Sequence, residues 1–472
     1  MTKRIVLSVI TLLVAVCIGL SLISVVSLVL LARSSRTAAS PTLPPTVPVP
    51  ATATQAPLTL TPTPPQDATL LPSGDEPSAE VAQQMDEIQQ QVIALRGLQP
   101  NAPVQRLLMS SEQLRQRVID DFFKDYTPAE AEDGSQVLSM FGLLEPGFDL
   151  YHLYLDLYSE QIAGFYDSET KEMYVIQGEG FQGPERMTYA HEFTHTLQDQ
   201  NYDLRQGLHI DEDYCETATE YCAAVTSLIE GDASLSEQFW YFQYSTETDQ
   251  QQVQEFYQNY QSPVYDSAPD FLKEDFVFPY KQGLEFVQSM YDRGGWPAID
   301  QVYTNLPQST EQILHPDQYP ADLPVTVELP DLSNLLGSEW RQLDDNSLGE
   351  WYLYLVLAFG RDANTRLLDS QAQQAAAGWE GDHYYVYWND SSQQALLFQR
   401  NLWELSSDVD EVWQAFEQYG QARWGQPTRR TADRLEWQNT PDGVVRFSRN
   451  GLETEWLIAP DAQLLEQILA QR

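Results

Sequence analysis

The chain has few basic side chains, few cysteines and few histidines. Its 26 lysines and arginines face 69 aspartates and glutamates, which gives a net charge of −43. Because contacts to phosphate depend on lysine and arginine, this balance argues against nucleic acid as a partner. There are 3 cysteines, one of them inside an apolar run, so the two pairs of a cysteine metal site are not present.

Long apolar runs are also scarce, and the clearest one lies near the N-terminus. Residues from Ile5 to Ala32 carry no charge and are mostly Leu, Val and Ile. This run exceeds the roughly 20 residues that span a bilayer, and it is long for the apolar part of a signal peptide. We therefore expect a signal anchor, a single transmembrane helix within residues 1–36, that places the protein at the cell membrane.

The next segment, residues 37–77, is rich in Pro, Thr and Ala. Such a composition cannot bury a core, so we expect an extended, solvated stalk. A stalk that holds a domain away from a membrane is most natural outside the cytoplasm, although a disordered cytoplasmic tether is the alternative. Beyond the stalk, the length of the chain predicts two or three domains, and we place two, at residues 78–322 and 323–472.

The most informative motif is H-E-x-x-H, formed by His191, Glu192 and His195. Gly183 and Pro184 precede it, and proline favours the first turn of a helix. On a helix, positions i and i+4 lie on one face, so both imidazoles can bind one metal ion, typically Zn²⁺. Glu192 can then act on a water molecule without ligating the metal. The alternative is a pair of buried histidines satisfied by hydrogen bonds.

A catalytic zinc site needs a third protein ligand. No third histidine follows at short spacing, but Glu230 lies in a proline-free stretch, from about Thr217 to Tyr244, with helical apolar spacing. This second helix can lie beside the first, and Gly231 and Ala233 favour close packing against another helix. Glu230 is therefore our candidate for the third ligand, against the alternative of a solvated helical glutamate.

The motif H-E-F-T-H-T-L-Q-D followed by a distant glutamate resembles the gluzincin metallopeptidases, the thermolysin-like clan. The resemblance implies zinc bound by His191, His195 and Glu230, with Glu192 as the general base. It also suggests that Asp199 is a carboxylate that orients a ligand histidine. The clan often has an aspartate four residues after the ligand glutamate, but this chain has Ser234 there, and whether Asp232 takes its place is open.

A second resemblance covers most of residues 95–420. It is to a poorly characterised group of bacterial metallopeptidase-like proteins, and it rests on four segments. These are S-E-Q-I-A-G-F-Y-D at 159–167, P-Y-K-Q-G at 279–283, G-G-W at 294–296 and S-T-E-Q-I-L-H-P at 309–316. The resemblance implies fold and chemistry but no substrate.

Two further features bear on peptide hydrolysis. Residues 162–166 and 173–176 predict two short strands joined by a turn, and an edge strand before a metal helix can bind extended peptide. An ordinary structural hairpin is equally compatible with this pattern. A donor that stabilises the developing oxyanion is expected downstream; His315 is our first candidate, with Tyr280, Tyr319 and His383 as alternatives.

Cys215 and Cys222 lie about 10 Å apart if one continuous helix contains both, which is too far for a disulfide. If the helix begins after Cys215, a disulfide becomes possible in an oxidising compartment. Two reduced, buried thiols are the other possibility.

The C-terminal residues predict a small α+β unit. Ser347 and Glu350 suggest a capping box for a helix through Ala358. The other predicted elements are strands at 384–388 and 395–398, a helix at 407–419, a hairpin of 444–447 with 454–458, and a helix at 461–471.

Together these features predict an α+β protein. It would have a mainly helical, zincin-like catalytic domain with a small hairpin or sheet, a small C-terminal α+β unit and an N-terminal transmembrane helix. The expected function is that of a membrane-anchored, extracytoplasmic zinc metallopeptidase acting on a peptide or protein substrate. The alternative is a non-catalytic, metal-stabilised module that binds peptides or cell-wall material.

Overall fold

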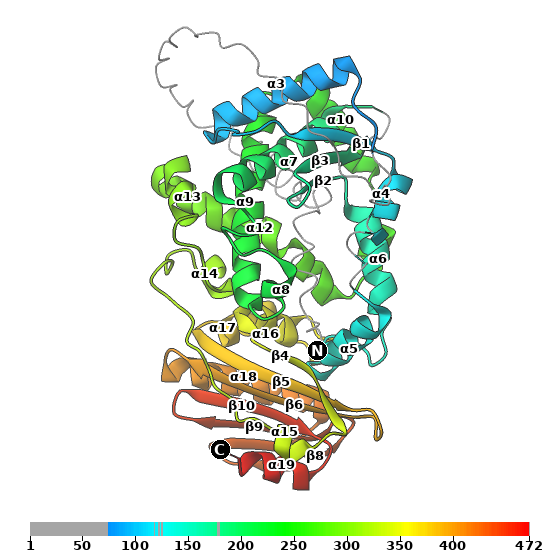
Figure 1. The fold of residues 1–472 in the computed structure, drawn as a ribbon. Helices are drawn as coiled ribbons and strands as arrows, with labels where there is room; N and C mark the ends of the chain where they lie inside the picture. Colours follow the sequence, from blue (N-terminus) through cyan, green and yellow to red (C-terminus); the bar gives the residue numbers. More distant parts are fainter. Residues whose placement is uncertain (1–73, 118, 121–122, 124–125, 177–179, 472) are drawn as a thin grey trace.

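The computed structural model describes residues 74–471, except 118, 121–122, 124–125 and 177–179. A helical part that contains a small sheet comes first along the chain, and a part built on a larger sheet follows it (Figure 1). The helices of the first part are α3 (Ala79–Arg96), α4 (Ser111–Arg117), α5 (Pro128–Met140), α6 (Leu150–Gln161), α7 (Gly183–Tyr202), α8 (Glu212–Cys215), α9 (Thr219–Gln243), α10 (Glu247–Asn259), α11 (Pro263–Ser267), α12 (Asp270–Gly294), α13 (Trp296–Val302) and α14 (Thr310–Leu314).

The small sheet contains β1 (Gln105–Met109), β2 (Gly164–Asp167) and β3 (Glu172–Ile176). Their order is β1-β3-β2, with β1 parallel and β2 antiparallel to β3. The hairpin predicted before the H-E-x-x-H motif is therefore confirmed, and its second half, β3, is the central strand. Its first half, β2, lies at the edge of the described sheet.

The large sheet has 7 strands in the order β4-β5-β6-β10-β9-β8-β7, and each neighbouring pair is antiparallel. The strands are β4 (Trp340–Asn346), β5 (Trp379–Asn389), β6 (Gln394–Trp403), β7 (Arg429–Arg430), β8 (Arg434–Thr440), β9 (Gly443–Asn450) and β10 (Glu453–Ala459). Its helices are α15 (Ser333–Leu336), α16 (Gly349–Ala358), α17 (Asp369–Ala376), α18 (Ser406–Trp424) and α19 (Ala462–Leu469), with the 3₁₀ helix η3 (Ala363–Thr365).

Successive side chains of this sheet point to opposite faces, as strand geometry requires. Val386 and Leu397 belong to the main core, which continues into the helical part through α16 and α18. Tyr387 and Phe398, one position further along, belong to a smaller core on the other face, which α15 and α19 cover. The aromatic and apolar side chains of β5 and β6 therefore belong to the core. One continuous apolar interior connects the sheet to the helices.

The fold class predicted from the sequence needs correction. The C-terminal unit is not a small addition, because the predicted strands at 384–388 and 395–398 and the predicted hairpin join through β6 and β10 into one seven-stranded antiparallel sheet. The transmembrane helix does not form part of the described fold either. No helix within the described ranges of 74–471 is both long enough and apolar enough to span a membrane. The segment from Ile5 to Ala32, on which that prediction rested, and most of the predicted stalk lie outside the described residues.

The predicted capping box of α16 is also wrong. Its first backbone N–H groups are capped by a carboxylate from the sheet, since Leu348 N and Gly349 N both donate to Asp382. The Ser347 hydroxyl donates to the backbone oxygen of Asp382. The Glu350 carboxylate accepts from His315 instead of reaching back to Ser347. Tertiary contacts have thus replaced the local cap that the sequence pattern suggested.

Candidate metal centre

Helix α7 carries the H-E-x-x-H motif, and its ends are fixed locally. Pro184 lies in the first turn, and the Glu185 side chain accepts from Gln182 N, which caps the helix start. The helix ends at Tyr202, and the residue that follows, Asp203, has a φ of 54°. Residues from Met187 to Asp199 are buried on every side, because α7 packs against α3, α9, α10 and the small sheet.

The structure brings together the three predicted ligands. The His191 and His195 rings lie on one face of α7 with centroids 4.7 Å apart. Glu230 approaches from α9, and its Oε2 atom lies 3.2 Å from His191 Nε2 and 3.4 Å from His195 Nε2. All three side chains are 0% exposed. They form a compact group of two nitrogens and one carboxylate that can hold a metal ion.

Close packing of α9 against α12 fixes the position of Glu230. A Cβ atom on Gly231 would lie 2.2 Å from the backbone oxygen of Gly283, and one on Gly283 would lie 2.2 Å from the backbone oxygen of Ser227. Only glycine permits this approach of two helix backbones. The predicted close packing at Gly231 is therefore confirmed, and α12 is the partner helix.

The Nδ1 atom of each histidine contacts a side chain that the sequence did not point to. His191 Nδ1 lies 2.9 Å from Glu237 Oε2, and His195 Nδ1 lies 2.8 Å from Gln198 Oε1. The amide of Gln198 is itself oriented, since its Nε2 donates to the backbone oxygen of Ile229 and to Asp232. A proton on each Nδ1 leaves each Nε2 facing Glu230, which is the arrangement of metal-ligating histidines.

Asp232 bonds to Gln198, the residue that contacts the ligand His195. It accepts two hydrogen bonds from Arg96 and one from Tyr303, in addition to the bond from Gln198. Arg96 also lies 4.7 Å from the centroid of the Trp296 ring. Asp232 thus supports His195 through Gln198 and joins α9 to α3, while the open question of a carboxylate for His191 is answered by Glu237.

Asp199 has a different position from the one that the resemblance suggested. It accepts from Tyr166, from Lys171 and from Leu204 N, and no contact with either ligand histidine is among its interactions. Tyr166 lies on β2 and Lys171 in the turn between β2 and β3. Asp199 therefore attaches the hairpin to the end of α7.

The donor set fits a divalent metal ion such as Zn²⁺. Burial on its own lowers the pKa of His191, but hydrogen bonds to Glu230 and Glu237 outweigh burial and raise the pKa to about 10. Burial raises the pKa of Glu230, and the charges and hydrogen bonds of His195 and His191 reverse that effect and lower it. His195 Nε2 is buried and faces Glu230 Oε2, as expected of a ligand atom.

Glu192 lies on the same turn of α7 and is also 0% exposed. The edge strand β2 passes directly over it, because a Cβ atom on Gly164 would lie 3.3 Å from Glu192 Cγ and 2.9 Å from Thr188 Cγ2. Glycine at this position lets the strand approach the helix. The structure therefore places the candidate base between the ligand group and the predicted peptide-binding strand.

Of the four predicted oxyanion donors, Tyr280 lies near the ligand group. Its ring centroid is 6.5 Å from that of His191, and it projects from α12. His315 is elsewhere: its Nε2 lies 2.9 Å from Glu350 Oε1, at the end of α14. The N-terminal turn of α14 bonds to Glu220, which is about 15 Å along α9 from Glu230. The structure does not bring His315 to the metal centre.

The two remaining candidates also have structural partners. The Tyr319 hydroxyl donates to the backbone oxygen of Asn305. His383 lies in the large sheet, with Nε2 2.8 Å from Asp345 and Nδ1 3.0 Å from the backbone oxygen of Val327.

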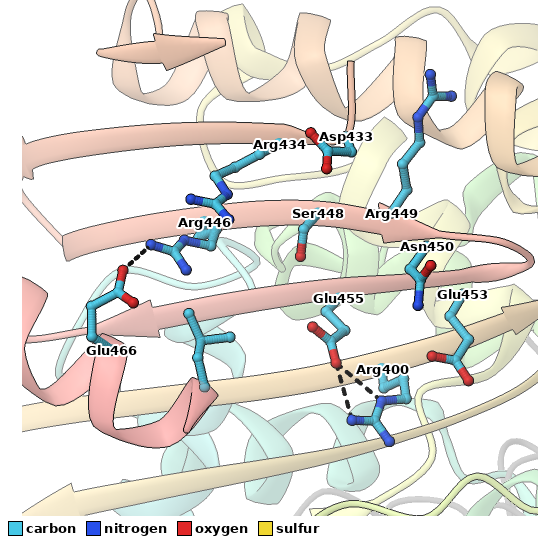
Figure 2. Close-up of a pocket in the computed structure, with 11 residues that line it drawn as sticks. Arg400, Asp433, Arg434, Arg446, Ser448, Arg449, Asn450, Glu453, Glu455 and Glu466 are labelled. Carbon is cyan, nitrogen blue, oxygen red and sulfur yellow. Dashed lines mark hydrogen bonds and ion pairs between the residues drawn. The ribbon is translucent and has the colours of Figure 1, made fainter. Parts of the chain in front are cut away.

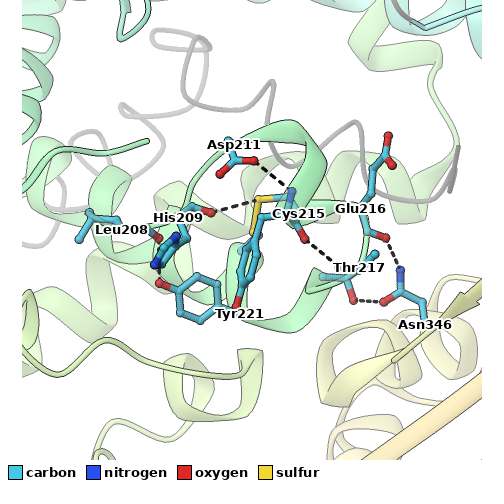
Figure 3. Close-up of a disulfide and its surroundings, with 11 residues drawn as sticks. Leu208, His209, Asp211, Cys215, Glu216, Thr217, Tyr221 and Asn346 are labelled. Atoms are coloured by element: carbon cyan, nitrogen blue, oxygen red, sulfur yellow. Dashed lines mark hydrogen bonds between the residues drawn. A yellow bond between two sulfur atoms is a disulfide. The ribbon is translucent and has the colours of Figure 1, made fainter. Parts of the chain in front are cut away.

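Cys215 and Cys222 form a disulfide (Figure 3). Helix α8 ends at Cys215 and α9 begins at Thr219, so the two cysteines are not on one continuous helix. Their Cα atoms are 5.6 Å apart. The bridged loop also contacts the large sheet, because Asn346 donates to the backbone oxygen of Glu216 and accepts from Thr219. Of the two possibilities that the sequence left open, the structure has the bridge.

A pocket on the large sheet is a weaker candidate for a site (Figure 2). Arginines and carboxylates line it in equal number, and they neutralise each other: Arg400 bonds to Glu455, and Arg446 bonds to Glu466. The charged residues that line it are Arg400, Arg434, Arg446, Arg449, Asp433, Glu453, Glu455 and Glu466. Such balance gives no preference for an anionic or a cationic ligand.

Comparison with known proteins adds one match. Residues 338–469, which contain the large sheet, match the family described as Domain of unknown function (DUF8575). No curated protein matches the chain, and no solved structure does. The candidate metal centre lies outside the matched residues, so its interpretation depends on its own geometry.

Proposed function

We propose that this protein is a zinc metallopeptidase in which His191, His195 and Glu230 hold the metal. The observation that carries the proposal is the convergence of two imidazole Nε2 atoms on one carboxylate, with each Nδ1 held by another side chain. This is the ligand set of a His₂Glu catalytic zinc site. When bound, zinc would lower the pKa of a water molecule and polarise the scissile carbonyl.

The side chains around the ligands supply the remaining functions. Glu192 accepts the proton from the attacking water and passes it to the leaving amine. Tyr280 takes the place of His315 as the proposed donor to the developing oxyanion, because it is the predicted donor that lies beside His191. Strand β2 binds the substrate backbone by strand addition, since it passes over Glu192 and forms the edge of the small sheet.

The disulfide supports a location outside the cytoplasm. Disulfides persist in oxidising compartments, and the bridge here joins buried Cys215, at the end of α8, to buried Cys222, in the first turn of α9. We propose that the described part of the chain acts in such a compartment on a peptide or protein substrate.

One observation favours a second candidate function. All three ligands and Glu192 are 0% exposed, and closed metal sites are usually structural. A metal-stabilised binding module without catalytic activity would need the ligands but no base. For a peptidase, the elements that cover Glu192 must open to admit substrate.

A comparison of wild type with Glu192→Gln separates the two functions. Both proteins are purified as the full chain, analysed for zinc and incubated with a mixed peptide library. The peptidase proposal expects cleavage by the wild type and at least a roughly 100-fold loss in the variant, with zinc retained. Glu255→Gln, an exposed change on α10, serves as the matched control and keeps full activity.

Full activity of Glu192→Gln would contradict the proposed mechanism. If neither protein cleaves any peptide while both bind zinc, and chelation lowers their melting temperature, the binding module is the correct function.

A further inference from the structure

A second group of acidic side chains lies where the helical part meets the large sheet. Glu311 is on α14, Asp322 follows α14 in the loop, and Glu404 directly follows β6. One carboxylate oxygen from each lies within 4.8 Å of the others. Oxygen ligands of Ca²⁺ lie 2.3–2.6 Å from the ion, so two ligands can be up to about 5 Å apart. The spacing therefore allows all three to bind one calcium ion.

One member of the group, Glu311, is buried, and Asp322 and Glu404 are partly buried, so this group differs from a fully solvated acidic patch. Glu311 is 2% exposed, and no hydrogen bond accepted by its carboxylate is found among the described residues. The Oδ2 atom of Asp322 is also buried and has no hydrogen-bond partner there. A buried carboxylate without a partner is costly, and the two unpartnered groups face each other. A cation between the two carboxylates would remove the free-energy cost of leaving them without a partner.

The surroundings supply more negative charge, and the positive group that acts on Asp322 and Glu404 is His315, which is already bonded to Glu350. Glu220 and Glu350 are close enough to act on Glu311, and each already accepts a hydrogen bond, Glu220 from Thr310 and Glu350 from His315. Burial, followed by the charges of Glu350, Asp322 and Glu404, raises the pKa of Glu311 to about 10.

We propose that Glu311, Asp322 and Glu404 bind a calcium ion that fastens the large sheet to the helical part of the protein. Ca²⁺ prefers six to eight oxygen ligands, and carboxylates with added waters supply them. The all-oxygen donor set distinguishes this site from the zinc centre, which has two nitrogen ligands. The site acts on stability, and it depends on no assumption about peptidase activity.

Two of the ligands belong to the helical part, and Glu404 belongs to residues 338–469. The same junction contains the contact between the disulfide loop and Asn346. A cation here links segments far apart in the chain, so its removal should loosen their packing before either part unfolds by itself.

Terbium luminescence tests the site directly. Tb³⁺ replaces Ca²⁺, and its emission can be excited through tryptophan; Trp403 precedes Glu404 in the chain. We expect the full-length wild type to show emission that saturates and that added Ca²⁺ reverses. Glu311→Gln should lose most of this emission, while Glu285→Gln, an exposed change on α12, should keep it.

Melting temperatures give a second measurement on the same proteins. In a calcium chelator, Glu311→Gln should melt higher than wild type, because a neutral amide removes the unfavourable burial of an ionisable group among other carboxylates. Millimolar Ca²⁺ should raise the melting temperature of wild type by several degrees and leave that of Glu311→Gln unchanged. Zinc content, measured in each sample, should be the same in both proteins.

The proposal is overturned if wild type shows neither saturable Tb³⁺ emission nor a Ca²⁺-dependent melting temperature. That result would mean that no cation binds between the three carboxylates. Equal responses of wild type and Glu311→Gln would also overturn it. An equal stabilisation by Mg²⁺ at the same concentration would contradict the assignment to calcium.

Discussion

The Glu237 carboxylate lies 2.9 Å from His191 Nδ1, about two helical turns after Glu230 on the same helix. Helix α9 therefore supplies both the carboxylate in front of His191 and the carboxylate behind it. The second of these fixes the ring orientation and makes the opposite nitrogen a better electron donor. The gluzincin pattern often has an aspartate at the position of Ser234. In this chain Glu237 supplies the carboxylate that contacts His191 instead.

Replacement of Glu237 by glutamine should weaken zinc binding without removing it. The amide oxygen can still accept from His191 Nδ1, but the negative charge is lost. We expect a 10- to 100-fold lower zinc affinity, as is typical for partners of metal ligands. A titration against a chromogenic chelator measures the affinity, with exposed Glu255→Gln as the control. Unchanged affinity in Glu237→Gln would remove its role in the centre.

The approach of α9 to α12 predicts a severe effect of a single methyl group. Gly231→Ala would place Cβ 2.2 Å from the backbone oxygen of Gly283, so the helices must separate. We expect a loss of several kcal/mol in the free energy of unfolding, measured by urea denaturation. Gly360→Ala is the matched control, because its Cβ would meet no atom closer than 3.4 Å. Equal stability of the two variants would show that the helix contact is looser than described.

Asp275 predicts a dependence of stability on pH. It is buried on α12 and accepts from Trp351 and Tyr352 on α16. Burial, only partly offset by these bonds, raises its pKa from 3.8 to about 6. The folded state thus binds the proton more tightly than the unfolded state. The stabilisation from this group is complete below about pH 4 and is lost as pH rises through 6.

Asp275→Asn should therefore raise the melting temperature at pH 7 and have a much smaller effect at pH 4. The gain in the free energy of unfolding at pH 7 is at most about 3 kcal/mol, which is the energy equivalent of the pKa shift. The amide oxygen keeps the bond from Trp351, and the Tyr352 hydroxyl can accept from the new amide nitrogen. Thermal unfolding across this pH range measures the effect. A stabilisation that is equal at both pH values would contradict the shifted pKa.

Tyr280→Phe tests the replacement of His315 as oxyanion donor. Loss of a donor to the transition state should lower kcat about 100-fold or more with little change in KM or zinc content. His315→Ala is the companion variant, since its partner is Glu350, far from the ligands. It should retain most of the activity. The reverse result, a large loss for His315→Ala alone, would restore His315 to the site.

The metal helix and its partner helix were predictable because their signals are local. Pro184 begins α7 and helical spacing places His191 and His195 on one face, so residues close in sequence determine this half of the centre. Glu230 required an assumption about helix packing, for which Gly231 was the available sign.

The groups behind the histidines were not predictable to the same degree. Gln198 follows His195 by one turn and could have been proposed from helical spacing, but the choice of Glu237 over Ser234 or Asp232 depends on how α9 is rotated against α7. The large sheet was underestimated because β4 is short of apolar residues, with Arg341, Gln342 and Asp344 in its sequence. Strand β4 pairs with β5, which lies more than 30 residues later in the chain, and the local sequence of β4 does not indicate this pairing.

The zinc content of the purified full-length protein tests the central claim most directly. Elemental analysis of wild type, His191→Ala and Glu230→Ala, each checked for folding by circular dichroism, gives the number of zinc ions per chain. We predict one in wild type and a large loss in both variants. A folded wild type that binds no zinc, or variants that bind as much as wild type, would contradict the claim.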